Sequence, residues 1–396
     1  MSGTGAPDPE ALALDAHERL ARHLASLGMG FPPRDQLLEL LRTHFTVAEA
    51  EAALLLPTAV GPFEVISAQV AAERGASSRN TPPVAAAYLS DTYERLVERG
   101  LLFAGRTAAG ERGYALHQVG YGFPQTFFWD GGNHPEASAM AEFVGKYFNR
   151  EVTRESYGGT ATKPYRYVPI DKSLDEGTQV VLPAHAMEPI LANAQTFALA
   201  HCPCRVGLRL RGRPCKHPED VCMKFDELAE FLIERGLGRQ IDRDEAREVV
   251  RRAAAEGLVH FVDNAEGDTK HNCNCCGCAC WNVGSIRRRK IPRDVLMATY
   301  FLRTTDVDEC IGCGRCIDIC PVEALTLAPA PPGRRKPQAK VAVVDEEWCI
   351  GCGVCVGRCP TGAAGLARRR DVSMELAPDF ATLHRRILDE RGLTQE

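Results

Sequence analysis

Eight of the seventeen cysteines lie in two runs of identical spacing near the C-terminus. The run ECIGCGRCIDICP has cysteines at positions 310, 313, 316 and 320, and the run WCIGCGVCVGRCP has them at 349, 352, 355 and 359. Each run follows the pattern C-x2-C-x2-C-x3-C-P, which is typical of thiolate ligands to [4Fe–4S] clusters. Three thiolates on one tight loop can wrap around a cubane, whereas the fourth is expected to point away from it.

The duplicated run resembles the bacterial-type ferredoxin domain over about residues 301–367. In two-cluster ferredoxins the fourth cysteine of each run ligates the other cluster. The resemblance therefore implies two crossed ligand sets: Cys310, Cys313, Cys316 and Cys359 for cluster I, and Cys349, Cys352, Cys355 and Cys320 for cluster II. Glycines at 312, 314, 351 and 353 would let the backbone approach the clusters. The segment APAPPGRRKPQAK between the halves is expected to form a surface loop.

The other nine cysteines lie in two stretches upstream, and the first 201 residues contain none. They are Cys202, Cys204, Cys215, Cys222, Cys273, Cys275, Cys276, Cys278 and Cys280. In a reducing compartment such clusters favour metal binding over disulfides. Adjacent cysteines and C-x-C pairs are awkward for one tetrahedral ligand set, so we expect both stretches to contribute to a site.

Three kinds of site remain open for these nine cysteines. A third Fe–S cluster, of the [4Fe–4S] type, is the leading hypothesis. A structural zinc site is the alternative, because four thiolates around zinc form an undemanding tetrahedron. A thiol-redox or catalytic site is the third. Two clusters would use eight of the nine cysteines, so two additional sites are also compatible with the count.

Polar residues flank the nine cysteines. His201, His217 and His271 are expected to be hydrogen-bond partners or surface residues rather than ligands. Arg205 and the RRRK run at 287–290 follow cysteines closely. This basic character indicates either a solvated face, or charge compensation of an anionic cluster and docking of an acidic partner.

The composition is that of a multidomain globular protein. The 396 residues are 45% hydrophobic and carry a net charge of −5. The chain as a whole therefore lacks the positive charge that favours binding to nucleic acids or membrane surfaces. No apolar run approaches the roughly 18 residues of a spanning helix, and no signal peptide is visible. We therefore expect a soluble, cytoplasmic protein without a membrane span.

Residues 34–116 are predicted to form helices followed by a β-hairpin. RDQLLELLRTHF has a helical apolar stripe, and Thr46 with Glu49 forms a capping-box signature. A further helix is predicted from residue 63, and another between a cap at Thr81, with Pro82 at its first position, and a stop at Gly100. The hairpin would occupy 101–116. This order of elements resembles a winged-helix domain.

The charges of this region argue against DNA binding. Residues 1–120 contain 10 Arg, no Lys and 14 Asp plus Glu, which gives a net charge of −4. Phosphate contacts supply most non-specific DNA affinity, and this surface is poorly built for them. We expect a protein–protein or domain-packing module and no nucleic-acid partner.

The middle of the chain mixes predicted helices and strands. AHAMEPILANAQTFALAHCPCR is predicted to be a helix that runs into the first cysteines, and FDELAEFLIERGLG and DRDEAREVVRRAAAEG are predicted helices. LVHFVDN, KPYRYVPIDKSL and GTQVVLP are predicted strands. The fold class is then α+β and multidomain. It comprises an N-terminal helical extension (1–33), a winged-helix-like domain (34–120), a mixed α/β cysteine-rich domain (121–300), a two-cluster ferredoxin-like domain (301–367) and a C-terminal helical tail (368–396).

The whole pattern, HCxCR…C…C…CNCCxCxC followed by the duplicated run, resembles a family of bacterial 4Fe-4S binding proteins over most of the chain. In that pattern a further cysteine often stands where this sequence has Ala279. The resemblance implies Fe–S electron transfer and brings no substrate. We expect an electron-transfer protein that serves a redox partner or is a subunit of an oxidoreductase. A reductase with its active site at the middle cysteines and an Fe–S redox-sensing transcriptional regulator are the alternatives, so whether the chain is itself an enzyme stays open.

Overall fold

The structure, a computed structural model, describes residues 14–57, 60–69, 86–107, 109–117, 122–157, 159–170, 173–174, 185–288, 290–333 and 340–393. The chain divides into unit 1, residues 1–127 and 142–156, and unit 2, residues 128–141 and 157–396. Helix α7 (Ala137–Tyr147) contributes to both units. Of the described helices, none combines the length and the apolar character needed to cross a membrane.

Unit 1 consists of helices and a small antiparallel sheet. Its helices are α2 (Ala16–Ala25), α3 (Asp35–His44), α4 (Val47–Ala53), α6 (Ala86–Glu98) and α8 (Arg150–Tyr157), whose last residue belongs to unit 2, and residues 63–69 are also helical. Strands β1 (Gly61–Pro62), β2 (Leu102–Arg106) and β3 (Arg112–Leu116) pair in the order β1-β3-β2. A 3-10 turn, η1 (Gln125–Phe127), follows them.

The predicted capping box of unit 1 is confirmed. The Thr46 side chain accepts a hydrogen bond from the Glu49 backbone N–H at 3.2 Å, and the Glu49 carboxylate accepts one from the Thr46 N–H at 2.9 Å. The predicted cap at Thr81 and Pro82 lies outside the described residues. The described elements follow the expected order of helices and hairpin, and the assignment to the winged-helix domains stays a prediction.

Unit 2 is built on a six-stranded antiparallel sheet of order β4-β8-β9-β6-β5-β7. The strands are β4 (Tyr165–Val168), β5 (Phe197–Ala200), β6 (Cys222–Phe225), β7 (Arg239–Ile241), β8 (Val259–Asp263) and β9 (His271–Cys275). Because successive side chains of a strand point to opposite faces, Met223 and Phe225 lie on one face and Cys222 and Lys224 on the other. The first face packs into a hydrophobic core with α10 (Met187–Asn193) and α13 (Arg243–Ala255).

Several predicted elements of unit 2 are confirmed and one is wrong. Helices α12 (Asp226–Glu234) and α13 and strands β4 and β8 lie where the sequence predicts them. The helix predicted to run into the first cysteines instead ends at Asn193, and residues 197–200 form β5. These residues pair with both β6 and β7, and this buried pairing outweighs their helical preference. The predicted strand GTQVVLP lies outside the described residues.

Three helices follow the cysteine stretches. Helix α11 (Pro203–Leu210) begins directly after Cys202, α14 (Trp281–Arg287) begins directly after Cys280, and α15 (Arg293–Leu296) leads toward the repeated runs. Cys202 and Cys280 are therefore both N-cap residues, and each connects a loop of the sheet to a helix.

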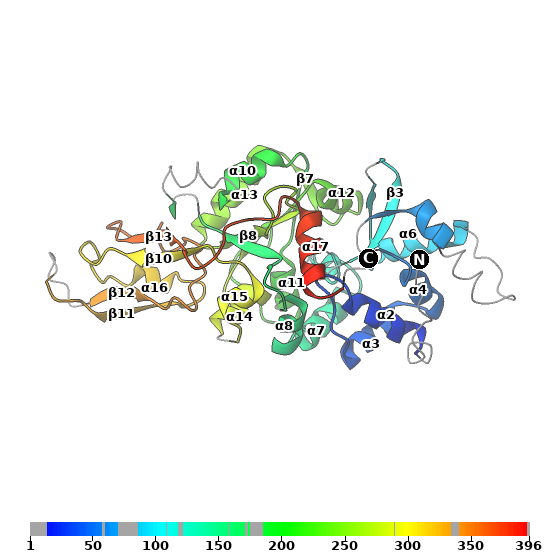
Figure 1. Cartoon of the computed structure of the whole chain (residues 1–396), viewed down its shortest axis with the longest axis horizontal. Helices are drawn as coiled ribbons and strands as arrows, with labels where there is room; N and C mark the ends of the chain where they lie inside the picture. Colours follow the sequence, from blue (N-terminus) through cyan, green and yellow to red (C-terminus); the bar gives the residue numbers. More distant parts are fainter. Residues whose placement is uncertain are drawn as a thin grey trace. The chain divides into compact units, whose positions relative to one another are not determined.

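The repeated runs form a separate sub-structure of unit 2, the repeat module (residues 301–368; Figure 1). It contains β10 (Phe301–Thr305), α16 (Arg315–Asp318), β11 (Leu325–Pro329), β12 (Lys340–Val344) and β13 (Ala364–Arg368). Strands β10 and β13 pair along their whole length, as do β11 and β12.

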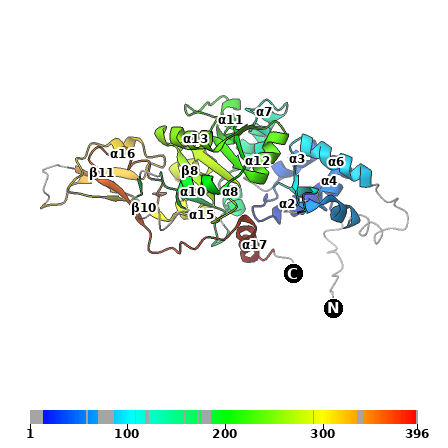
Figure 2. The ribbon, with the colours of Figure 1, turned by 90° about the horizontal axis from the view of Figure 1, so that it is seen from above.

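After β13 the chain returns to the sheet of unit 2 (Figure 2). Ala377 forms a parallel bridge with Ala265, just beyond β8, and helix α17 (Phe380–Glu390) follows. Leu383 and Ile387 of α17 pack with both alanines in one buried cluster. The C-terminal helix is thus part of the body that carries the six-stranded sheet.

Candidate metal and cluster sites

Two cavities in the repeat module are each lined by four cysteines. Cys310, Cys313, Cys316 and Cys359 line cavity I, and Cys320, Cys349, Cys352 and Cys355 line cavity II. With the open solvent at their mouths included, the spaces between protein atoms measure about 340 Å³ and 330 Å³. The structure therefore brings the eight cysteines together in the same two crossed groups that the ferredoxin resemblance implies.

Left-handed glycines shape the loops around the cavities. Gly312 and Gly351 occupy equivalent positions in the two runs and have φ values of 64° and 62°. A Cβ atom at Gly351 would lie 2.1 Å from the carbonyl oxygen of Phe301, and one at Gly312 would lie 2.5 Å from that of Lys340. Only glycine fits this close approach of loop and strand without displacing the backbone.

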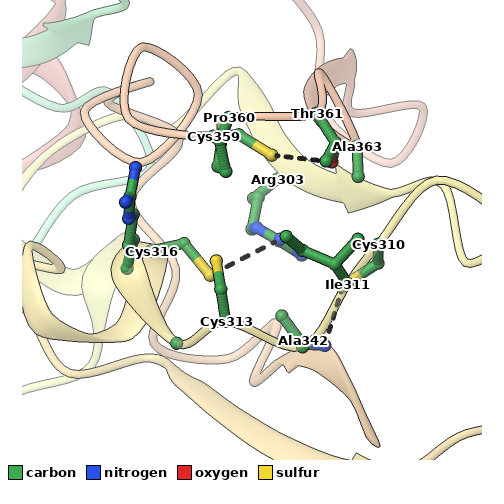
Figure 3. A pocket seen from close by; sticks show the side chains of 13 residues that line it. Arg303, Cys310, Ile311, Cys313, Cys316, Ala342, Cys359, Pro360, Thr361 and Ala363 are labelled. Carbon is green, nitrogen blue, oxygen red and sulfur yellow. Dashed lines mark hydrogen bonds between the residues drawn. The ribbon is translucent and has the colours of Figure 1, made fainter. Parts of the chain in front are cut away.

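A buried arginine lies between the two cavities. Arg303, on β10, is 3% exposed and lines both of them. Its guanidinium donates to Cys316 Sγ at 3.9 Å and to the hydroxyl of Thr305. Figure 3 shows this side chain among the four cysteines of cavity I. No spacing or motif marks Arg303, because its position relative to the cysteines is defined only once β10 pairs with β13.

Backbone amides also point at the sulfur atoms. The N–H of Ala342 donates to Cys310 Sγ at 3.5 Å, and that of Ala324 donates to Cys320 Sγ at 3.3 Å. Such N–H···S bonds stabilise thiolate ligands. Burial raises the pKa of Cys355 to about 12, against the opposing effect of the Arg303 charge. The thiolate form here therefore needs a positive partner, which a bound cluster or metal provides.

The nine middle cysteines divide into two groups. An inner group of six comprises Cys202, Cys204, Cys222, Cys273, Cys275 and Cys280, whose thiols affect the pKa values of their neighbours. An outer group of three comprises Cys215, Cys276 and Cys278. The run CNCCGCAC supplies members of both groups, so it does not act as one ligand set.

The sheet explains how the inner group assembles. Cys273 and Cys275 are two residues apart on β9 and therefore point to the same face. The antiparallel register that pairs Met223 with Asn272 brings Cys222 beside Cys273. Cys202 follows the end of β5, and Cys280 lies at the start of α14.

Neighbouring thiols of the inner group shift one another's pKa values in opposite directions. Bonds with Cys222 and Cys275 hold the pKa of Cys273 well below its usual value, and bonds with Cys204 and Cys275 do the same for Cys280. Bonds with Cys202 and Cys280 raise the pKa of Cys204. The titration of each thiol in the inner group therefore depends on that of its neighbours.

Two buried cations accompany these sulfurs. Although burial opposes its charge, Lys224 is 2% exposed, and the nearby thiols of Cys222 and Cys273 raise its pKa. Arg205 is fully buried and donates to the carbonyl oxygens of Pro218 at 2.6 Å and Asn274 at 2.9 Å. A buried cation requires a nearby anion. Thiolates are such anions for both side chains, and the Asp263 carboxylate also raises the pKa of Lys224. The sequence indicated Arg205, but not Lys224.

The flanking polar residues behave mostly as expected. His271 pairs with the buried Asp263 at 3.1 Å, and His201 contacts the carbonyl oxygen of Trp129 at 3.2 Å. His217 lies outside the three-cysteine outer group. In the RRRK run, Arg287 forms an ion pair with Glu323 of the repeat module at 2.7 Å.

Comparison with known proteins agrees with the repeat module. A family model described as the 4Fe-4S dicluster domain matches residues 309–363. This match supports a ferredoxin-type region with Fe–S clusters and an iron–sulfur electron-transfer role. No curated protein matches the chain.

Proposed function

We propose that the chain is an iron–sulfur electron-transfer protein, with one [4Fe–4S] cluster in cavity I and one in cavity II of the repeat module. The observation that carries the proposal is the pair of four-cysteine cavities on either side of Arg303. Four thiols, inward-directed amides and a buried cation fit an anionic cluster. When bound, the clusters supply one-electron transfer, and the protein sets their potential and contact surface.

Cavity I is the side that a redox partner would approach. Cys313 is exposed there, and the neighbouring Ile311 is 40% exposed. The loop of cavity II is instead covered by segments of unit 2 outside the repeat module. The Ile170 N–H donates to the carbonyl oxygen of Cys352 at 3.1 Å, and Arg293 donates to that of Cys349 at 3.2 Å. This asymmetry supports a role as a partner or subunit of an oxidoreductase.

The inner group of six cysteines is proposed to hold the third Fe–S cluster. Lys224 and Arg205 supply positive charge beside it. The phenols of Tyr157 and Tyr167 are buried near its sulfurs. The pKa of Tyr167 is raised by burial and also by Cys280 and Cys275 of the inner group and Cys352 of cavity II, so this side chain is near both sites.

Iron and acid-labile sulfide analysis of anaerobically purified protein, with EPR of the reduced form, tests this proposal. Two clusters in the repeat module and one in the inner group predict about twelve irons per chain. About eight irons would restrict Fe–S chemistry to the repeat module and overturn the third cluster. A content well below eight would overturn the proposed function itself.

A reductase is the second candidate function. The sequence predicts its active site at the middle cysteines, but a cavity of about 450 Å³ lies elsewhere in unit 2. Lys163, Asp294, Glu375 and Arg386 line it and give it mixed charge. Asp294 directly follows Arg293, which binds the backbone of Cys349. This cavity therefore adjoins the cavity II loop and has a size suited to a small polar substrate.

Oxidation of a reduced viologen dye by the full chain, with a panel of small polar acceptors added, tests the reductase. Met297 is buried and lines the cavity, so Met297→Trp should block substrate-dependent oxidation while the iron content stays unchanged. Equal rates with and without acceptors would rule this function out for the panel tested.

A further inference from the structure

The outer cysteine group has the dimensions of a site for a single metal ion. Cys215 Sγ lies 3.0 Å from Cys278 Sγ and 3.7 Å from Cys276 Sγ, and the last two are 3.2 Å apart. Thiolates bound to one zinc ion at about 2.3 Å lie about 3.8 Å apart at tetrahedral angles. Terminal thiolates of a cubane are separated by roughly 6 Å. The outer group therefore matches one ion better than a cubane.

Arg205 lies near thiols of both groups. Its charge interacts with the thiols of Cys276 in the outer group and of Cys202 and Cys275 in the inner group. The two backbone carbonyls that it binds, those of Pro218 and Asn274, fix it in place. A fixed cation near two sets of thiolates favours two separate centres over one extended cluster.

The loop that carries Cys276 and Cys278 is held in place from both sides. The Ala279 N–H donates to Cys276 Sγ at 3.5 Å, and the Cys280 N–H donates to the carbonyl oxygen of Cys276 at 3.3 Å. A Cβ atom at Gly277 would lie 1.9 Å from the carbonyl oxygen of Pro321, which follows Cys320. This close approach requires glycine and packs the outer group against the cavity II loop.

We propose that Cys215, Cys276 and Cys278 bind one zinc ion through three thiolates. A tetrahedral zinc ion then has a fourth position for water, as in sites with three protein ligands. Cys276 is buried whereas Cys278 is exposed, so this position opens toward solvent on the Cys278 side. Three thiolates and Zn²⁺ carry a net charge of −1, which Arg205 balances.

This inference goes beyond the proposed function, because it assigns the outer group a mononuclear ion that carries no electrons. Zinc analysis and zinc K-edge X-ray absorption of the full chain, purified anaerobically with its iron, test it. We expect about one zinc per chain with three sulfurs at about 2.3 Å and one lighter atom. The double variant Cys215→Ser/Cys278→Ser should retain at most about a tenth of the zinc after dialysis against a weak chelator.

Iron content separates the possible outcomes. The proposal requires the double variant to keep its iron, and it requires Ala279→Ser, which alters the same loop without removing a thiol, to keep both metals. Loss of about four irons in the double variant would place the outer group in an Fe–S cluster and overturn the proposal. Absence of zinc from the wild type, or a four-sulfur shell, would also overturn it.

The single variant Cys278→Ser guards against misfolding of the double variant, because Cys278 is exposed. Its zinc shell should fall to two sulfurs, with unchanged iron and an unchanged far-UV spectrum. An unaltered three-sulfur shell would contradict the assignment of Cys278. Iron well below eight per chain in the wild type would count against the proposed function. The zinc content and its sulfur shell would still decide the zinc proposal.

Discussion

At the scale of single residues, Arg303 is the charged side chain that lines both cysteine cavities of the repeat module. Its guanidinium is nearly inaccessible to solvent and faces both cysteine cavities. A positive charge near a cluster favours the reduced form, because reduction adds negative charge. In a buried site this effect is screened far less than at the surface.

Replacement of Arg303 by Met should make both clusters harder to reduce. We expect their midpoint potentials to fall by roughly 50 to 100 mV, since one charge is removed near each cluster at an intermediate effective dielectric. EPR-monitored redox titration measures both potentials. Arg315→Met is the matched control, because Arg315 lines cavity I but is exposed, and its shift should be several-fold smaller. Equal shifts in the two variants would show that Arg303 has no special role.

Residues were predictable where chemistry demands a local spacing. The eight cysteines of the repeat module were identifiable because one loop must supply three ligands. Arg303 and Lys224 were not, because each reaches its sulfurs only through strand alternation and strand pairing. The division of the nine middle cysteines into an inner and an outer group could not be predicted either, because adjacent residues such as Cys275 and Cys276 belong to different groups.

At the scale of elements, strand β9 is the least expected feature. HNCNC has no apolar alternation, yet it pairs with β6 and β8 and places Cys273 and Cys275 on one face. The opposite face carries Asn272 and Asn274, which hydrogen-bond each other at 2.9 Å. Polar side chains that satisfy one another replace the usual apolar face, and a hydrophobic pattern cannot reveal such a strand.

The loops of the repeat module depend on individual glycines, and Gly351→Ala tests this dependence. The new Cβ would clash with the carbonyl of Phe301, and φ would remain in the left-handed region. We expect a loss of at least about 1–3 kcal/mol of local stability and faster loss of iron to a chelator under anaerobic conditions. Gly357→Ala is the matched control, because a Cβ there meets nothing within 4 Å. Similar iron loss in both variants would contradict the steric argument.

At the scale of the whole molecule, unit 1 combines helices and a hairpin, and residues 1–120 carry a net charge of −4. Arg112 is engaged with Glu94 of α6 at 3.0 Å, and Arg99 contacts Glu49 at 3.4 Å. These arginines are therefore already paired with carboxylates and are poorly placed to bind phosphates. A protein-contact role for unit 1, without a nucleic-acid partner, stays a prediction.

The full chain should show no saturable binding to duplex DNA at physiological salt, in either the oxidised or the reduced state. Fluorescence anisotropy with labelled duplexes measures this. The charge-reversal variant Asp91→Lys/Glu94→Lys should gain weak, salt-sensitive binding, which shows that the assay detects it. Specific retention that changes with cluster oxidation state would support the redox-sensing regulator instead.

The pairing of β10 with β13 has a consequence for how the chain could be dissected. The repeat module begins and ends at the same two-stranded neck, and the chain then returns to place Leu383 and Ile387 against Ala265. The module is therefore an insert within the body of unit 2 and not an appendage at its end. Truncation at residue 300 would also strip α17 from the sheet domain and expose its apolar contacts. An internal excision of residues 301–368, closed by a short linker across the neck, would leave that helix to dock on the remaining protein.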